Sequence, residues 1–559
     1  MLKIFKQYYP VRNIFFVIGE FLVICSSALS ANFILYGTGI FVGNWALIFK
    51  IILIAWICQI CLYYNDLYDL KITDNFSELS TRLLQALGAS AIILAGIYAV
   101  FPGASIGLRV FIVCVAFDIV FIVSWRLGYT LILKYRIFDE KIVLLGSGEL
   151  SKNIFHEVLD RKDCGYVVSA VFLEGPKISD NVMRKYADKR KDLHIIDSGY
   201  HENLCEFSKS TGIRKIVVAL EDKRGGKFPT KELLKCRVDG IDILEGTTFY
   251  EMLTGKLIVD HINPGWLIFS DGFRKSRIQR FCKRSIDLLL SFFMLIFLFP
   301  LILFIALLIK LDKKKPEHAF ADIWKYFNRI CSEEGVCPQD KIRFLIMEKL
   351  NMETKEGAAC SFTEIWQAFR ARCSAKNEAF SDALQAIMKS YIDFKEPEDD
   401  SVSPVFFSQE RMGEKGRIYN ILKFRSMIVN AERFSGPMWA GEDDRRITRI
   451  GNFIRKWRID EIPQLWNVLK GEMSFVGPRP EREHFVRQLE QTIPYFRERL
   501  SVKPGITGWA QVCYGYGASE DDAKEKLNYD LFYIKNMSIA MDLMIVLRTI
   551  KIVIFGKGR

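Results

Sequence analysis

Four apolar stretches occupy the first quarter of the chain, and each is close to the ~20 residues that a helix needs to cross a bilayer. They are residues 14–36, 45–64, 83–101 and 108–125. The loops after the first and third stretches carry almost no charge. This pattern predicts a domain of four transmembrane helices over residues 1–135.

Charged residues around and within these stretches predict the topology. Basic residues flank the domain: Lys3, Lys6 and Arg12 precede it, and Arg126, Lys134 and Arg136 follow its last stretch. The positive-inside rule therefore places both ends in the cytoplasm. Glu20 and Asp118 lie inside apolar stretches. Acids at such positions are candidates for a functional site, and the alternative is that they join helices within the bundle.

Residues 136–272 have the pattern of a Rossmann-like α/β domain. "KIVLLGSGEL", "GYVVSAVFLEG" and "IRKIVVALED" are typical of buried parallel strands separated by helices. The first strand leads into Gly146-Ser-Gly148-Glu-Leu-Ser151, with Ser151 where a dinucleotide-binding turn has its third glycine. Two interpretations stay open: a nucleotide cradle at a helix amino terminus, with Glu174 near the ribose, or a module that binds no nucleotide.

A fifth apolar stretch lies within residues 273–312 and contains Pro300 near its middle. Basic clusters flank it on both sides, with Lys283 and Arg284 before it and residues 313–315 after it, which favours a cytoplasmic position for both flanks. Proline removes a backbone hydrogen bond and clashes with the preceding turn. We therefore expect a re-entrant membrane helix that breaks at Pro300 and returns. The alternative is a proline-kinked span.

The remaining chain divides into two parts. Residues 313–400 are mixed in charge, have apolar positions at helical spacing and end in the linker-like "KEPEDD", which predicts a helical insertion of unknown role. In residues 401–559, "PVFFSQERMGEKGRIYNILKFRSM" predicts a β-hairpin with a glycine-containing turn, and amphipathic helices follow. This last part is predicted to be a mixed α/β domain.

Composition narrows the class of protein. The chain of 559 residues suggests three or four domains of about 100–200 residues each. Its net charge of +12 and mean hydropathy of +0.12 suit a membrane protein whose cytoplasmic face meets anionic lipid or phosphorylated substrates. The 13 Cys have no regular spacing, which argues for reduced thiols and against a secreted disulfide framework.

The stretch "IDEIPQLWNVLKG" carries the candidate chemistry. Asp460 can cap a helix, Pro463 is tolerated in its first turn, and Gly471 suits its end. A helix dipole favours ionised carboxylates at this end, and basic residues just upstream, including Arg455, are expected to lower the pKa values of Asp460 and Glu461 further.

Such a pair can serve phosphoryl chemistry. An ionised aspartate beside cations is a candidate nucleophile toward phosphorus, and an adjacent carboxylate can hold Mg²⁺, which neutralises phosphate charge. The structural alternative is that Asp460 only caps the helix and Glu461 only complements its dipole.

Several blocks stand in order along the chain: "KRSIDL" before the proline-broken helix, "PVFFSQERMGEKGR", "KFRSM", "DDRRITRIGNFIRK", "IDEIPQLWNVLKGEMSFVGPRPERE" and "VKPGITGWAQVCYGYGAS". Over residues 283–312 and 401–558 they resemble the bacterial sugar transferases, which are polyprenyl-phosphate hexose-1-phosphate transferases. The first half resembles the larger members, which place four spans and a Rossmann-like domain before the catalytic unit. The ending "YGYGASEDDAKEKLNYDLFYIKN" is most similar to the EpsB-type subgroup of exopolysaccharide systems.

The resemblance implies an activity and a location. The expected reaction moves hexose 1-phosphate from a UDP-sugar to undecaprenyl phosphate and releases UMP, which initiates the synthesis of exopolysaccharide or another glycan. The implied partners are the UDP-sugar, undecaprenyl phosphate and membrane lipid, with Mg²⁺ as cofactor and no nucleic acid; a homo-oligomer stays open. The protein would be a multi-pass protein of the bacterial inner membrane with a cytoplasmic catalytic domain.

The resemblance also implies roles for three residues of the acidic stretch and its flank. Asp460 would attack the phosphorus attached to the sugar and form a covalent phospho-sugar aspartate. Glu461 would bind Mg²⁺. Arg455 would hold phosphate oxygens, where a guanidinium can donate two parallel hydrogen bonds.

Further residues are implied around this pair. Pro478-Arg479-Pro480 would shape the uridine site, and the alternative is a rigid loop. Lys423 and Arg425 of "KFRSM" would face phosphate, with solvated strand charges as the alternative. Lys283 and Arg284 would meet lipid headgroups.

Two features depart from the family pattern. Phe299-Pro300 stands where Ser-Pro is usual, and residues 313–400 interrupt a segment that would be restored by joining Asp312 to Ser401. Because loop closure costs little more for a long insertion than for a short one, such a module can be tolerated. It would be a regulatory or partner-binding domain, or a foreign segment that disrupts activity.

Two other function classes are alternatives. A nucleotide-sugar dehydratase or epimerase needs an intact dinucleotide fingerprint and a Tyr-x-x-x-Lys pair. Here the fingerprint is altered, and "YADKRK" from Tyr186 lacks that spacing. The other alternative is a non-enzymatic membrane scaffold that the insertion has inactivated.

Overall fold

The computed structural model divides the chain into two compact units. The first comprises residues 1–274 and 531–542, and the second comprises residues 275–530 and 543–559. The residues described are 2–4, 7–9, 11–37, 44–68, 76–135, 139–161, 163–173, 193–196, 204–220, 228–262, 272–273, 275–312, 320–350, 362–375, 379–395, 404–428, 444, 446–515, 517 and 519–555.

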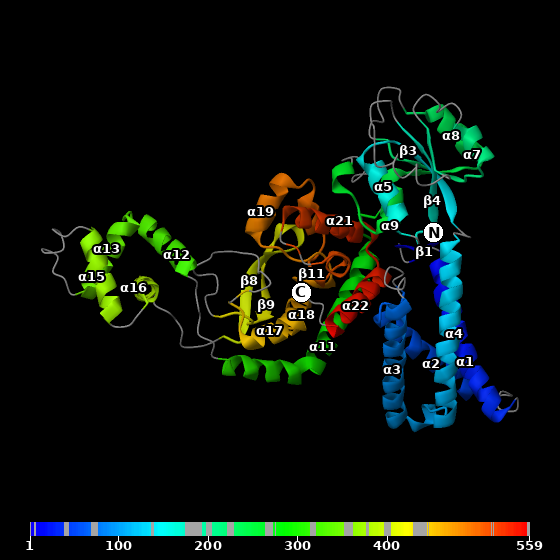
Figure 1. The fold of residues 1–559 in the computed structure, drawn as a ribbon, viewed down its shortest axis with the longest axis horizontal. Helices are drawn as coiled ribbons and strands as arrows, with labels where there is room; N and C mark the ends of the chain where they lie inside the picture. The colour runs from blue at the N-terminus through cyan, green and yellow to red at the C-terminus, as the bar shows by residue number, and fades with distance from the viewer. Residues whose placement is uncertain are drawn as a thin grey trace. The chain divides into compact units, whose positions relative to one another are not determined.

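The first unit opens with a short antiparallel hairpin and four long helices (Figure 1). The elements are β1 (Leu2–Ile4), β2 (Gln7–Tyr9), α1 (Val11–Tyr36), α2 (Trp45–Tyr64), α3 (Phe76–Val100), the 3-10 turn η2 (Pro102–Ala104) and α4 (Leu108–Lys134). Each long helix is long and apolar enough to cross a membrane. The four predicted stretches are thus helical, although α3 begins earlier and α4 extends further than their apolar cores.

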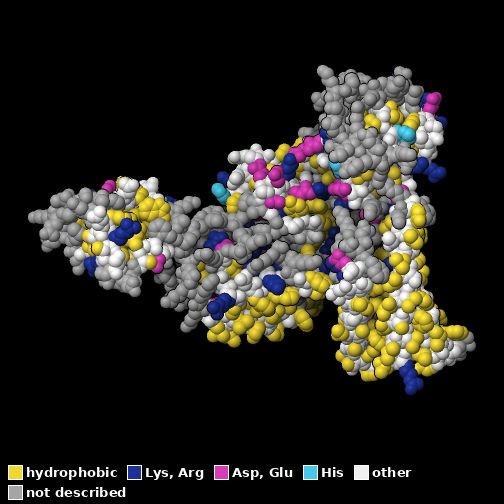
Figure 2. Space-filling model, in the orientation of Figure 1, with side chains coloured by type: hydrophobic (Ala, Val, Ile, Leu, Met, Phe, Trp, Pro, Cys, Tyr) yellow, Lys and Arg dark blue, Asp and Glu magenta, His cyan; other side chains and the backbone are white. Residues whose placement is uncertain are grey.

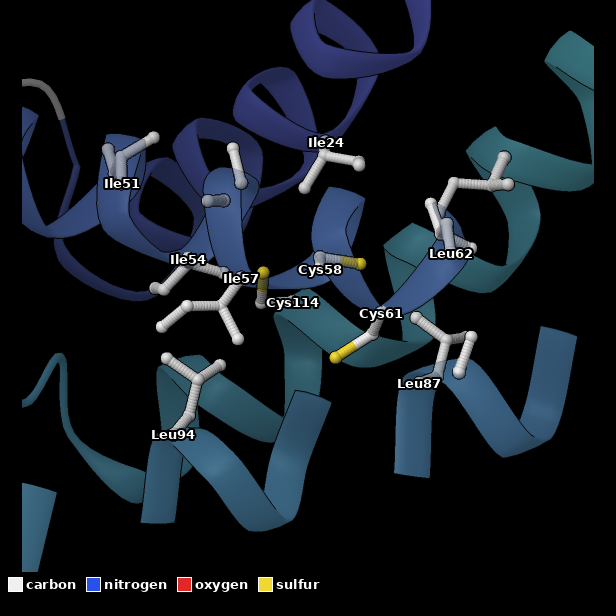
Figure 3. Packing of buried hydrophobic residues seen from close by; sticks show 14 of the residues in the cluster. Ile24, Ile51, Ile54, Ile57, Cys58, Cys61, Leu62, Leu87, Leu94 and Cys114 are labelled. Carbon is white, nitrogen blue, oxygen red and sulfur yellow. The ribbon is translucent and has the colours of Figure 1, made fainter. Parts of the chain in front are cut away.

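The interior of this bundle is packed by aliphatic side chains and thiols (Figure 3). Cys58, Cys61 and Cys114 are buried there and make no disulfide. The two intramembrane acids both join α1 to α4. Glu20 pairs with Arg126 at 2.7 Å, and Asp118 accepts a hydrogen bond from the Ser27 hydroxyl. These contacts support the interpretation that the acids hold helices together.

An α/β domain follows in the same unit. Its five strands are parallel and lie in the order β5-β4-β3-β6-β7. The elements are β3 (Glu140–Leu145), α5 (Glu149–Asp160), β4 (Tyr166–Phe172), β5 (His194–Ile196), α7 (Leu204–Ser210), β6 (Lys215–Val218), α8 (Thr230–Val238), β7 (Asp242–Glu245), α9 (Gly246–Thr254) and η4 (Val259–His261). The three predicted strands are confirmed. The short β5 and β7 were missed because neither carries a long apolar run.

The glycine turn after β3 is closed by its own side chains. Gly146 has a φ of +131°, and a Cβ there would lie 2.4 Å from the carbonyl oxygen of Ala219, so glycine is required. Ser151 is buried and its hydroxyl donates to the Gly146 carbonyl at 2.7 Å. Glu174 and Tyr186 lie outside the described residues. Both interpretations of this turn therefore stay predictions.

The second unit begins with α11 (Arg277–Leu311), which contains Pro300. Ser276 caps it by accepting a hydrogen bond from the Gln279 N–H at 3.1 Å. Figure 1 shows that α11 changes direction sharply within its length. It is the fifth helix among the described residues that is long and apolar enough to cross a membrane.

The insertion forms helices around a core of its own, as its apolar spacing predicted. They are α12 (Phe320–Glu333), α13 (Pro338–Leu350), α15 (Phe362–Ala375) and α16 (Phe380–Lys395). Phe327, Ile346, Ile365 and Met388 are among the side chains buried in this core.

The chain beyond the insertion is mixed α/β, and residues 531–542, which end α21 and begin α22, belong to the first unit. The elements beyond the insertion are β8 (Phe406–Met412), η5 (Glu414–Gly416), β9 (Ile418–Phe424), α17 (Arg449–Lys456), η6 (Ile459–Glu461), α18 (Gln464–Lys470), β10 (Ser474–Val476), α19 (Glu483–Thr492), η7 (Phe496–Ser501), β11 (Gly505–Thr507), α20 (Trp509–Cys513), α21 (Glu520–Asn536) and α22 (Ile539–Ile554). Strands β8 and β9 form the predicted hairpin. Strands β10 and β11 pair in parallel.

Apolar side chains remain exposed on parts of both units. Figure 2 shows them covering the helical bundle and gathering along one face of the second unit. In the second unit they include Phe297 of α11, at 84% exposed, and Leu543 of α22, at 60%. Exposed apolar surface of this extent is typical of contact with a membrane or a protein partner.

Candidate active site

The acidic pair lies in a turn and not in the first turn of a long helix. Arg458 has a left-handed φ of 53°, and the short η6 turn that follows contains Asp460 and Glu461. The next helix, α18, begins only at Gln464 and has no side-chain cap. The prediction that Asp460 caps this helix was therefore wrong, because the left-handed turn folds the pair inward. Gly471 ends α18 in the left-handed conformation, as predicted.

Glu461 is held by cations from three elements. Its side chain is only 8% exposed. Oε1 accepts hydrogen bonds from Lys423 Nζ of β9 at 3.0 Å and from Arg479 Nη2 at 3.2 Å, and Oε2 lies 3.5 Å from Arg458 Nη1. Although burial opposes ionisation, Lys423, Arg479 and Arg458 together hold the pKa of Glu461 well below its usual range.

The pKa of Asp460 shifts in the opposite direction. It is 8% exposed, and burial, together with the negative charge of Glu461, raises its pKa to about 6. Lys423, Arg455 and Arg479 oppose this rise but do not cancel it. The expectation that nearby cations lower the pKa of Asp460 was therefore wrong. The cations pair mainly with Glu461, whose charge then disfavours a second one beside it.

Arg455 supplies an unsatisfied donor next to the pair. It lies in the last turn of α17, and its charge acts on Asp460. Its Nη1 is buried and has no hydrogen-bond partner among the described residues. A buried guanidinium nitrogen without a partner suits a site that an anionic ligand completes.

The two basic residues of "KFRSM", Lys423 and Arg425, have different surroundings. Lys423 reaches Glu461, so the alternative of a solvated strand charge does not hold for it. Arg425 is 8% exposed, and burial lowers its pKa while the carboxylate of Asp312 opposes the shift. Its predicted role toward phosphate stays a prediction.

The loop Pro478-Arg479-Pro480 is fixed by close backbone packing. It follows β10, and a Cβ on Gly505 of the paired β11 would lie 2.1 Å from the Gly477 nitrogen. The side chain of Arg479 then extends from this loop to Glu461. A small cavity adjoins the loop and is lined by Met412, Gly413, Pro478, Arg479, Pro480, Glu481, Val486, Arg499, Leu500, Val502 and Pro504.

Lys283 and Arg284 tie α11 to α18 and β10. Lys283 Nζ donates to the Val476 carbonyl at 3.0 Å, and Arg284 donates to the carbonyls of Val468 and Leu469 at 2.5 and 2.7 Å. The Val468 and Leu469 carbonyls lie at the end of α18, where a helix dipole favours cations, and the Val476 carbonyl ends β10. This role was not predicted, and the predicted contact with lipid headgroups stays a prediction.

Sequence reasoning missed two residues that shape the candidate site. Asn467 of α18 donates to the Asn420 carbonyl at 2.7 Å and accepts from the Leu422 N–H at 3.0 Å, which ties the helix to β9. Asp287 of α11 accepts from the Phe475 N–H at 3.1 Å. Their partners lie 45 to 188 residues away, so no local pattern identifies them.

The residues present fit a magnesium ion only together with substrate. Among the described residues, no group of three or more His, Cys, Asp or Glu side chains could hold a metal. Asp460 and Glu461 provide two adjacent carboxylates, and Mg²⁺ is commonly held by one or two carboxylates plus substrate phosphates. Asp460 and Glu461 therefore suit a site in which the protein and the substrate phosphates would hold the ion together.

The comparisons with known proteins concern this part of the chain. Residues 390–556 match a family model described as bacterial sugar transferase, which confirms the predicted resemblance over these residues. The chain is 49% identical over 159 residues to UDP-N-acetylgalactosamine-undecaprenyl-phosphate N-acetylgalactosaminephosphotransferase of Aeromonas hydrophila, covering 28% of this chain and 37% of the relative.

Two further relatives match over a similar number of residues. The galactosyl transferase CpsE of Streptococcus agalactiae is 46% identical over 165 residues, which are 28% of this chain and 36% of that protein. The UDP-glucose:undecaprenyl-phosphate glucose-1-phosphate transferase of Xanthomonas campestris is 43% identical over 151 residues, 27% of this chain and 31% of that protein. The chain thus spans about a third of the length of the curated relatives it matches.

Proposed function

We propose that this protein is a membrane-bound transferase that moves hexose 1-phosphate from a UDP-sugar to undecaprenyl phosphate and releases UMP. The step would initiate the synthesis of exopolysaccharide or another glycan. One observation carries the proposal: two adjacent buried carboxylates, Asp460 and Glu461, face the cations of Lys423, Arg455 and Arg479. The names of the relatives point to the same reaction class.

The chemistry follows from the difference between the two carboxylates. Ionised Asp460 attacks the phosphorus attached to the sugar, the bond from that phosphorus to the bridging oxygen breaks, and UMP leaves with the electron pair. An oxygen of the lipid phosphate then attacks the same phosphorus and displaces Asp460, which regains its carboxylate. Lys423, Arg455 and Arg479 are placed to neutralise the phosphate charge during both displacements.

Glu461 has two tasks in this scheme. It orients Lys423 and Arg479, and with Asp460 it would hold Mg²⁺ against the substrate phosphates. When bound, the ion would withdraw charge from the diphosphate.

The two ends of α11 support the re-entrant interpretation. Near its start, Asp287 accepts from the Phe475 N–H; just past its end, Asp312 accepts from the Ile450 N–H at 3.1 Å. On a straight helix these two residues would lie about 37 Å apart, which exceeds the ~30 Å of a bilayer's hydrocarbon core. A helix that turns back within the membrane brings both ends to the proposed catalytic part, residues 401–559, on one side. Pro300 provides the break.

We infer the location from the proposed substrate together with the topology. Nucleotide sugars are cytoplasmic, and four spans followed by a re-entrant helix keep the catalytic part in the cytoplasm of a bacterial inner membrane. The apolar faces of α11 and α22 would then meet lipid. We also infer that the α/β domain is Rossmann-like, on the basis of its parallel strand order, and that the chain is of the EpsB type, on the basis of its final motif.

UMP release tests the proposal directly. Membranes that contain the full chain would be incubated with Mg²⁺, undecaprenyl phosphate and, in turn, UDP-glucose, UDP-galactose and UDP-N-acetylgalactosamine. Release of UMP that requires the lipid phosphate is expected for at least one sugar. A scaffold would release none, and a dehydratase or epimerase would change the sugar without releasing UMP.

A further inference from the structure

We propose that Asp530, acting through Arg499, positions the loop of residues 478–480 for binding of the nucleotide sugar. The inference rests on the proposed transfer reaction and concerns a residue to which the resemblance assigned no role. Asp530 is a positioning residue, since it reaches the acidic pair only through other side chains.

A continuous set of hydrogen bonds connects Asp530 to the acidic pair. Oδ2 of Asp530, in α21, accepts from Arg499 Nη2 at 2.9 Å. The same nitrogen donates to the backbone carbonyl of Arg479 at 3.0 Å. The Arg479 side chain in turn donates to Glu461 at 3.2 Å. One guanidinium nitrogen therefore joins α21 to the loop that carries the cation of the site.

Arg499 is held in one orientation. It is 6% exposed, and its guanidinium carbon lies 5.0 Å from the centre of the Phe496 ring. Asp530 is 1% exposed. Its pKa is raised to about 6 by burial, against the attraction of Arg499, so the carboxylate is ionised at neutral pH. A buried guanidinium with a charged partner at this distance has little freedom to turn.

The loop backbone is held from a second side by Arg411. Its Nη1 donates to the Pro480 carbonyl at 3.3 Å and lies 3.9 Å from Glu481 Oε2. Two arginines thus hold consecutive carbonyls of the loop. The side chain of Glu481, which faces Arg411, is 25% exposed, whereas Asp530, which pairs with Arg499, is buried. Asp530 is therefore the acid best placed to set the loop.

A buried ion pair contributes little net stability relative to apolar side chains of the same volume. What this pair provides is a donor aimed at the Arg479 carbonyl. If Asp530 becomes Asn, Arg499 loses its charged partner and can turn toward Glu481, which lies 3.9 Å away. The Arg479 carbonyl is then released, and the loop presents its side chain to the diphosphate less often.

The test compares Asp530→Asn with Leu531→Ala in the full chain in membranes, using the UDP-sugar that the wild type turns over. Leu531 is fully buried on the same helix, so its truncation controls for loss of stability. For Asp530→Asn we expect KM for the nucleotide sugar to rise about tenfold and kcat to change less than about threefold. An unchanged KM, or an equal rise for Leu531→Ala at matched melting temperature, overturns the proposal.

A double-mutant cycle separates a positioning role from a general one. In an Arg479→Ala background, Asp530→Asn is expected to change KM by less than about twofold, because its effect passes through the loop. Independent, multiplicative effects of the two substitutions contradict that route.

The positioning role of Asp530 can still be tested if no transfer reaction is observed. A wild type that releases no UMP from any UDP-sugar refutes the proposed function and leaves hydrogen exchange as the measurement. Asp530→Asn is then expected to speed exchange in a peptide covering residues 476–482, and Leu531→Ala is not. Equal exchange in the two variants overturns the positioning role.

Discussion

The ammonium nitrogen of Lys423 lies 3.0 Å from Oε1 of Glu461, although 38 residues separate them along the chain. Strand β9 delivers the lysine and the η6 turn delivers the carboxylate. Because the same oxygen also accepts from Arg479, one carboxylate oxygen orients two cations. Fixed charges of this kind stabilise developing negative charge without reorganisation during the reaction.

Asp460→Asn is expected to abolish UMP release, with a loss of about 10³-fold or more, because the amide cannot attack phosphorus. The change is nearly isosteric, so the protein should reach the membrane at a normal level. Asp521→Asn, an exposed acid at the start of α21, is the matched control and should keep full activity. Near-normal turnover by Asp460→Asn would remove Asp460 as the nucleophile.

Glu461→Gln is expected to weaken the dependence on Mg²⁺ together with the rate. Glutamine keeps an oxygen for Lys423 but loses the charge that would attract the ion. The measurement is a Mg²⁺ titration of UMP release, with Asp521→Asn as control. A titration midpoint equal to that of the wild type, at measurable activity, would argue against a metal role for Glu461.

The pH dependence of the reaction should report Asp460. Its pKa of about 6 means that the carboxylate is largely ionised at pH 8 and mostly protonated at pH 5. Since only the ionised form attacks, kcat/KM is expected to fall about tenfold per pH unit below about pH 6. Removing the charge of Glu461 lowers the pKa of Asp460, so the limb of the Glu461→Gln variant should move to lower pH. A profile flat to pH 5 would contradict the assignment.

Most residues of the candidate site were predicted from the sequence, because charge and motif are local properties. Asp460, Glu461, Arg455, Lys423 and Arg479 were all predicted, and each is now found with its charge acting within one cluster. The opposite pKa shifts of the two acids were not predictable. They depend on burial and on which cation meets which oxygen, and both are set by tertiary packing.

The fold was predictable to a similar depth. The periodicity and length of apolar stretches predict long apolar helices and apolar strands, so the bundle, the central strands and the hairpin were expected. The short strands β5 and β7 carry no such signal. The contacts of Arg284 and Asp530 could not be predicted either, because the sequence around a single charged residue on a helix does not indicate which distant residue it contacts.

Thiol labelling tests the re-entrant helix. Cys337 is exposed in the insertion, so a membrane-impermeant thiol reagent should leave it unlabelled in intact cells and label it after permeabilisation. Gly103→Cys, in the loop between α3 and α4, is expected to label from outside and serves as the positive control; a Cβ fits there without contact. Labelling of Cys337 in intact cells that exclude the reagent from a cytoplasmic marker would show that α11 spans the membrane.

The insertion provides the last prediction. We expect residues 313–400 to fold by themselves and their removal, by joining Asp312 to Ser401, to preserve or restore transfer. The four helices α12, α13, α15 and α16 share one core, and Phe327 in it is fully buried. A segment of this length can bury only a modest core, so its stability should depend strongly on such residues.

A purified fragment of residues 313–400 should therefore show helical circular dichroism and one cooperative melting transition. Phe327→Ala should lower its stability by about 3–5 kcal/mol, enough to abolish the transition. Phe344→Ala, at an exposed position of α13, is the control and should change the stability of the fragment little.

An unstructured fragment would mean that the helices need the catalytic part. A folded fragment whose deletion aggregates the protein would mean that the catalytic part needs the helices. Either result would refute a separate module while leaving the transferase proposal to the UMP measurement.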